Sequence, residues 1–117
     1  MNMKIAIPTS DRKILFKRTG QTKEFAIYSV SQGSYEFLEF RKNPHDHDHE
    51  EKKDHMHSHK EILETLDDCD AILVFTTGAH FRKDFDAANM PMYRTKESKL
   101  DSVIDTFTKD MLRHKRI

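Results

Sequence analysis

The sequence predicts a single α/β domain, in which a mixed five-stranded sheet with the element order βββαβαβα carries helices on its faces. Three observations predict this class. The 117 residues suit one domain. The N-terminal part contains three short runs of strand-forming residues separated by polar segments. The C-terminal part alternates short apolar runs with segments whose apolar residues recur at helical spacing. Such βα units extend a sheet and cover it with helices.

Three strands are expected before the middle of the chain. Each run is rich in β-branched and aromatic residues and is bounded by turn-forming residues. These runs are residues 3–8, 25–30 and 35–40. The turn sequence at 31–34 separates the second run from the third, so these two strands should form an antiparallel hairpin. A polar loop at 17–22 follows the first strand, and its Gly20 can adopt a positive φ angle.

The first helix and the last two strands are predicted from cap signals and apolar runs. Ser58 and Glu61 have the spacing of a capping box, so a helix should begin at His59. The continuous apolar run at 70–75 is typical of a central strand that is covered on both faces. A shorter run at 90–93 predicts the fifth strand.

Two further helices are predicted by apolar periodicity. The first follows the central strand, with apolar residues spaced four and three apart: Phe81, Phe85 and Ala88. The second follows a cap signal at Ser98, and it is amphipathic. Its apolar positions are Leu100, Val103, Ile104, Phe107 and Met111.

The composition excludes several classes of protein. Twenty basic and twenty acidic side chains give a formal charge of zero, so no nucleic-acid partner is indicated. No apolar run approaches the ~20 residues of a membrane span, and the N-terminus is strand-like rather than a signal peptide. The single cysteine, Cys69, allows no internal disulfide and is expected to be a buried apolar filler. We therefore expect a cytoplasmic protein with no membrane partner.

A histidine-rich tract at residues 45–59 is the most unusual feature of the chain. It is an insertion, at 43–58, between the third strand and the first helix of a fold that is complete without it. Imidazole nitrogen binds zinc, nickel and iron, and the tract also carries carboxylates. The predicted metal ligands are His45, His47, His49, His55, His57 and His59. The alternative is a solvated loop that binds metal only opportunistically.

Several short stretches, in this order, resemble a known family. They are residues 3–8, 20–28, 69–74 and 77–79, with the closing helix that contains Val103 and Ile104. Together they resemble the dinitrogenase iron-molybdenum cofactor biosynthesis family, although Arg18-Thr19-Gly20 stands where that family usually has His-Phe-Gly. The resemblance implies a three-layer ribonuclease H-like fold. It also implies an iron-sulfur or iron-molybdenum cluster as ligand and a client metalloprotein as partner.

A second candidate site follows the central strand. Ligands of open α/β sheets collect at the carboxyl ends of the strands. The loop after the first strand and the start of the helix at 79 should line one crevice there, with hydroxyls and backbone N–H groups facing an anionic ligand. The predicted cofactor-binding residues are Arg18, Gly20, Thr77, Gly78 and His80. The alternative is a plain strand–helix turn.

Catalysis is not expected. A metal-dependent nuclease needs carboxylates on its strands, yet the first strand has none and Asp70 precedes its strand. Glu36 and Glu39 should point to opposite faces because their spacing is odd. The preferred function is a non-catalytic metal or metallocluster carrier, an accessory factor in metallocofactor biosynthesis. The alternative is an interaction or regulatory domain whose tract is a metal buffer or pH-responsive loop, and which forms a homo-oligomer.

Overall fold

A computed structural model describes residues 3–44 and 60–113. The first three strands are β1 (Met3–Thr9), β2 (Glu24–Ser31) and β3 (Ser34–Lys42), with a short 3-10 turn, η1 (Thr19–Gln21), before β2. The second half contains α1 (Lys60–Thr65), β4 (Ala71–Val74), α2 (Ala79–Ala87), β5 (Met92–Arg94) and α3 (Leu100–Arg113). Every expected strand and helix is present in the expected order.

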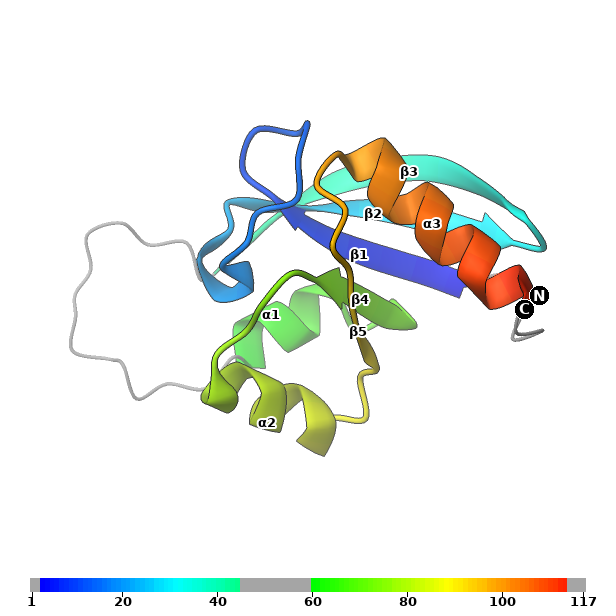
Figure 1. Cartoon of the computed structure of the whole chain (residues 1–117). Helices are drawn as coiled ribbons and strands as arrows, with labels where there is room; N and C mark the ends of the chain where they lie inside the picture. Colours follow the sequence, from blue (N-terminus) through cyan, green and yellow to red (C-terminus); the bar gives the residue numbers. More distant parts are fainter. Residues whose placement is uncertain (1–2, 45–59, 114–117) are drawn as a thin grey trace.

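The five strands form one mixed sheet in the order β3-β2-β1-β4-β5. β1 pairs antiparallel with β2 and parallel with β4, and β5 is parallel to β4. Helices α1 and α2 lie on one side of the sheet and α3 lies on the other (Figure 1). This is the three-layer ribonuclease H-like α/β architecture that the sequence predicts.

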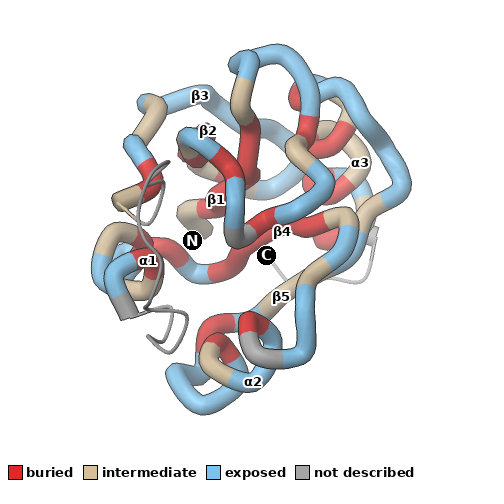
Figure 2. The backbone as a smooth tube through the Cα atoms, turned by 90° about the vertical axis from the view of Figure 1, so that its left-hand side faces the viewer, coloured by how far each residue is buried: buried red, intermediate tan, exposed pale blue. Residues whose placement is uncertain are grey.

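Two apolar cores fill the spaces between the layers. Alternation along β1 divides its side chains, so that Ile5 and Ile7 pack against α3 while Ala6 packs on the α1 and α2 side. All four residues of β4 are buried, as the continuous apolar run predicts. Figure 2 shows the buried segments of β1, β2 and β4 running through the centre of the molecule. No helix in the described ranges has the length and apolar character needed to cross a membrane.

The predicted faces of β3 are wrong at one position. The pairing register shifts at Ile27/Tyr28, so Ile27 pairs with Glu39 while Tyr28 pairs with Phe37, which leaves Leu38 as an extra residue. Such a β-bulge reverses the alternation of side chains. Glu36 and Glu39 therefore lie on the same face of the sheet, the one that α1 and α2 cover.

Candidate functional site

The loops after β1 and β4 meet at one edge of the sheet. These two strands are parallel, so their carboxyl ends lie side by side. The backbone of Arg18 forms a parallel bridge with Thr76, and the hydroxyl of Thr19 donates to the carbonyl oxygen of Thr76 at 3.2 Å. The structure thus brings the loop that carries Arg18 and Gly20 against the segment that leads into Thr77 and Gly78.

Buried threonines hold the long loop between β1 and β2 in shape. The hydroxyl of Thr9 donates to the carbonyl oxygen of Ile14 at 2.7 Å and accepts from the backbone N–H of Arg12 at 3.0 Å. The hydroxyl of Thr22 donates to the carbonyl oxygen of Thr9 at 2.8 Å. Both threonines are fully buried, so their hydroxyls need these internal partners. The loop is therefore a preorganised structure, which the sequence analysis did not identify.

Two positively charged side chains, those of Arg18 and Lys17, lie at this edge. The Arg18 side chain is exposed, and within the described residues its contact is a long hydrogen bond from Nη1 to Oε1 of Gln21, at 3.5 Å. The ammonium of Lys17 lies 5.0 Å from the centre of the Phe75 ring. Most of the guanidinium of Arg18 is thus available to an external anion.

The start of α2, on the other side of the predicted crevice, has no side-chain cap. Gly78 is the N-cap residue, and a Cβ atom added to it would meet nothing within 4 Å. The first N–H groups of a helix have no intrahelical partner and attract anions. The hydroxyl of Thr77 is turned away, because it contacts the sulfur of Met92 at 3.9 Å. The backbone of His80 lies in the first turn of α2.

The described residues that flank the histidine tract lie near the predicted crevice. Buried Asn43 donates from its backbone N–H to the carbonyl oxygen of Lys23 at 2.8 Å, and from Nδ2 to that of Thr22 at 2.7 Å. The end of β3, the η1 turn and the starts of α1 and α2 gather at one end of the molecule (Figure 1). The six predicted histidine ligands lie outside the described residues. Within residues 3–44 and 60–113, no three His, Cys, Asp or Glu side chains form a group that could hold a metal ion.

Cys69 lies at the other end of the sheet, where β1 and β4 begin. Burial, with the nearby carboxylate of Asp68, raises the pKa of the Cys69 thiol to about 12. The thiol is therefore protonated at neutral pH and is a poor metal ligand. This agrees with the prediction that Cys69 is an apolar filler.

A charged network joins that end of the sheet to Arg41, which lies near the end of β3 and pairs with Phe25 of β2. Arg41 donates two hydrogen bonds to Asp68, at 2.6 and 2.9 Å, and a third to the carbonyl oxygen of Thr65 at 2.8 Å. The ammonium of Lys4 lies 2.9 Å from Asp68. The guanidinium of Arg41, followed by Lys4, holds the pKa of the Asp68 carboxyl well below its usual range. The network joins β1, β3 and the segment after α1, and nothing in the sequence pattern indicated it.

Solved structures with the same fold include three that cover nearly the whole chain. A provisionally named dinitrogenase from Methanocaldococcus jannaschii is 18% identical, with a TM-score of 0.66, and the match covers 94% of this chain and 91% of that one. A protein named PH0822 is 16% identical, with a TM-score of 0.73 and coverages of 92% and 90%. A provisionally named NifB protein from Thermotoga is 18% identical, with a TM-score of 0.65 and coverages of 92% and 88%. At these identities the likeness concerns the fold alone.

Family membership is decided by sequence rather than by fold. No curated protein matches this chain. A family model described as dinitrogenase iron-molybdenum cofactor, however, matches residues 1–110. That match includes both loops of the crevice and the histidine tract. The chain therefore belongs to the dinitrogenase iron-molybdenum cofactor family.

Proposed function

We propose that the protein is a non-catalytic carrier that holds an anionic metallocluster, or a divalent metal ion, at the carboxyl edge of β1 and β4. The cluster or metal is cargo, destined for a client metalloprotein in metallocofactor assembly. The observation that carries the proposal is the Arg18–Thr76 backbone bridge, which joins the loop of an exposed arginine to the segment that leads into the uncapped start of α2. The family's association with the iron-molybdenum cofactor supports an anionic cluster as the cargo.

The donor set of the chain fits histidine ligation better than thiolate ligation. Iron-sulfur clusters are commonly held by several cysteine thiolates. This sequence has one cysteine, which is buried, protonated and at the far end of the sheet. Metal bonds would therefore come from His45, His47, His49, His55, His57 and His59. Arg18, Gly20, Gly78 and the first amides of α2, including that of His80, would bind the cluster's negative charge.

The position of the tract supports a joint role for tract and crevice. Its first anchor, Asn43, is bonded to the same loop that presents Arg18, through Thr22 and Lys23. A metal ion held by the tract would therefore lie close to the loop that carries Arg18. Thr77, by contrast, would act through its backbone, because its hydroxyl faces Met92.

Parallel titrations test this proposal. Calorimetry with Zn²⁺, Ni²⁺ and Fe²⁺ under anaerobic conditions would compare the protein with a variant in which the six tract histidines are serine. We expect at least a tenfold loss of metal affinity in the variant, since several tethered imidazoles act together. Equal affinity in the two proteins would contradict the role of the tract.

A second pair of variants separates the crevice from the tract. Arg18→Ala should weaken binding of an anionic iron-sulfur cluster, followed by its absorbance, and leave Zn²⁺ binding unchanged. Arg94→Ala removes an exposed arginine of β5 and serves as the control. If Arg18→Ala and Arg94→Ala behave alike, the crevice does not bind the cluster. The protein would then fit the alternative, an interaction domain whose tract buffers metal.

A further inference from the structure

A cavity lies between β3 and α3, on the α3 side of the sheet. Its volume is about 630 Å³, and four aromatic side chains line it: Tyr28, Tyr35, Phe37 and Phe40. We call it the aromatic groove. The pairing of β2 with β3 explains it, because Tyr28 pairs with Phe37, Val30 with Tyr35 and Ala26 with Phe40, all on the α3 face. The groove is separate from the crevice, and its role is independent of the proposed function.

The rings of the groove contact one another but leave part of their surface open. The ring centres of Tyr28 and Phe37 are 5.6 Å apart in an edge-to-face arrangement, and those of Phe37 and Phe40 are 4.8 Å apart. Phe37 is 45% exposed and Tyr35 is 37% exposed. Clustered, exposed apolar side chains commonly mark a binding site. The open surfaces can stack against a planar ring.

The side chain of Arg12 forms one wall of the groove, and a carboxylate balances its charge. The guanidinium of Arg12 lies 4.4 Å from the centre of the Phe40 ring. It also donates two hydrogen bonds to the carboxylate of Glu24, at 2.8 and 2.7 Å. Because Glu24 balances its charge, Arg12 supplies a fixed planar surface rather than a free cation.

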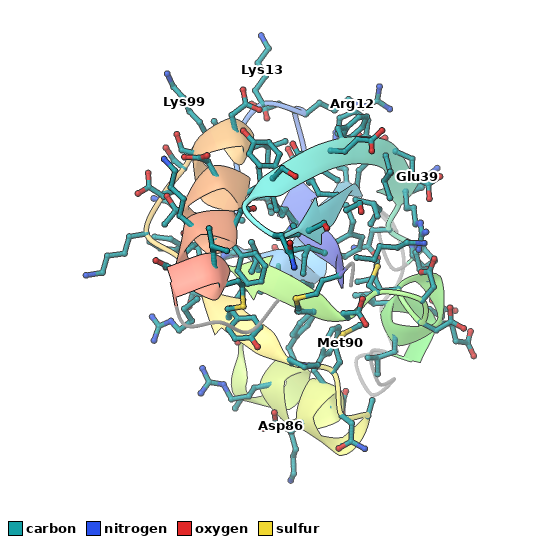
Figure 3. All side chains as sticks on the ribbon, turned by 90° about the vertical axis from the view of Figure 1, so that its right-hand side faces the viewer. Arg12, Lys13, Glu39, Asp86, Met90 and Lys99 are labelled. Carbon is teal, nitrogen blue, oxygen red and sulfur yellow. The ribbon has the colours of Figure 1, made fainter. Side chains whose placement is uncertain are left out.

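Two lysines stand at the rim of the groove, Lys13 and Lys99. Neither ammonium forms an ion pair in the described part of the chain, although Lys13 interacts electrostatically with the carboxylate of Asp11. Their backbones are held together, since Ile14 bridges to Lys99 and the N–H of Leu100 donates to the carbonyl oxygen of Lys13 at 3.0 Å. Figure 3 shows both side chains projecting beside the start of α3, with Arg12 lying over β3. One carboxylate, Asp101, also lines the groove and partly offsets them.

We propose that the aromatic groove binds a small planar aromatic phosphate of mononucleotide size. The ring stacks on Phe37 and Tyr35, and the phosphate is held by Lys13 and Lys99. A cavity of this volume falls within the range of roughly 300–1,000 Å³ found for small-molecule sites. Within the described residues neither rim ammonium is in an ion pair, so the two lysines favour an anion over a neutral ring.

Flavin mononucleotide is a suitable probe because its ring fluoresces and because riboflavin is the same molecule without the phosphate. Fluorescence anisotropy should give saturable binding of flavin mononucleotide tighter than about 1 mM, and binding of riboflavin several-fold weaker. Absence of saturable binding would overturn the proposal. Equal binding of the two probes would overturn the role of the lysines.

Neighbouring residues of β3 provide a matched pair of variants. Phe37→Ala should weaken binding about five- to a hundredfold, the effect of losing one aromatic stacking contact. Leu38→Ala removes a side chain that is 42% exposed on the same strand but does not line the groove, so binding should not change. Equal loss in both variants would contradict the proposal. It would also be contradicted if the protein bound no flavin mononucleotide and instead formed a homodimer, detected by sedimentation, that Phe37→Ala dissociates. Circular dichroism would establish that each variant is folded.

Charge variants test the rim. The double variant Lys13→Gln/Lys99→Gln should reduce flavin mononucleotide binding to the level of riboflavin. The control double variant Lys23→Gln/Lys83→Gln removes two exposed lysines elsewhere and should have no effect. Asp101→Asn should tighten binding slightly. If both double variants lose affinity equally, the attraction is general and the groove is not a phosphate site.

Discussion

The two ends of the sheet differ in how far their charged and polar groups are paired within the protein. Where β1 and β4 begin, the carboxylate of Asp68 is paired with Lys4 and with Arg41, whose side chain reaches it from near the end of β3, and the only thiol is buried and protonated. Where these strands end, the guanidinium of Arg18 is exposed, with one long hydrogen bond within the described residues, and Gly78 gives α2 no side-chain cap. We therefore expect the Asp68 network to stabilise the fold, and we propose that the exposed groups at the other end bind a ligand. Substitutions in the network should lower stability, whereas substitutions of the exposed groups should affect binding.

The largest expected effect on stability concerns the anchor of the open end. Asn43→Ala should lower the free energy of unfolding by about 2 kcal/mol, because it leaves the buried carbonyl oxygen of Thr22 without its hydrogen bond. Urea denaturation measures this change. Lys42→Ala, an exposed neighbour, is the control. If Asn43→Ala weakened metal binding without any loss of stability, the anchor would be a ligand rather than a structural residue.

At the fixed end, Asp68→Asn should cost about 1–2 kcal/mol at pH 7, a value reduced by the partial exposure of the carboxylate. The pKa of Asp68 is lowered in the folded state, so its contribution is present above the unfolded pKa of about 4. It is lost progressively as the pH falls from that value through the lower pKa of the folded state. The stability difference between the variant and the original protein should therefore shrink in acid.

Urea denaturation at pH 7 and at pH 3 measures this dependence. Asp67→Asn removes a neighbouring exposed carboxylate for which the described residues give no ion pair, so it should have almost no effect at either pH. A stability difference for Asp68→Asn that does not change with pH would contradict the assignment of its charge to the network.

The smallest stability effect is expected at the start of α2. Gly78→Ser should add a side-chain cap and raise the free energy of unfolding by a few tenths of a kcal/mol. The new hydroxyl would occupy an amide that the cluster is proposed to bind, so cluster affinity should fall. Gly78→Ala is the control, since its Cβ meets open space and offers no oxygen. A cluster affinity that survives Gly78→Ser would remove α2 from the site.

Much of the fold could be predicted because its signals are local. The alternating run at 3–8 and the continuous apolar run at 70–75 both predicted strands, and most of their residues are buried. Because the carboxyl ends of parallel strands meet at one edge of a sheet, the Arg18 loop was expected near the Thr76 segment, and a backbone bridge joins the two. The error at Glu36 and Glu39 arose because a β-bulge leaves no mark in the pattern of residue types.

Other features could not be predicted because they depend on pairs far apart in the chain. A buried threonine in a loop, such as Thr22, looks in the sequence like any exposed loop threonine. The ion pair of Arg41 with Asp68 joins residues 27 positions apart. The aromatic groove could not be predicted for a related reason. Phe37 and Tyr35 are residue types typical of a buried strand face, and only the packing of α3 in the structure shows that these side chains stay partly exposed.

The comparison between the two ends can be tested in one spectrum. One equivalent of paramagnetic Ni²⁺, added to ¹⁵N-labelled protein, broadens amide signals close to the metal. If metal binds at the open end, the amide signals of Gly20 and Gly78 should disappear, while those of Cys69 and Asp70 remain sharp. Broadening at Cys69 and Asp70, or metal binding that leaves Gly20 and Gly78 unaffected, would contradict the claim that the histidine tract brings metal to this crevice.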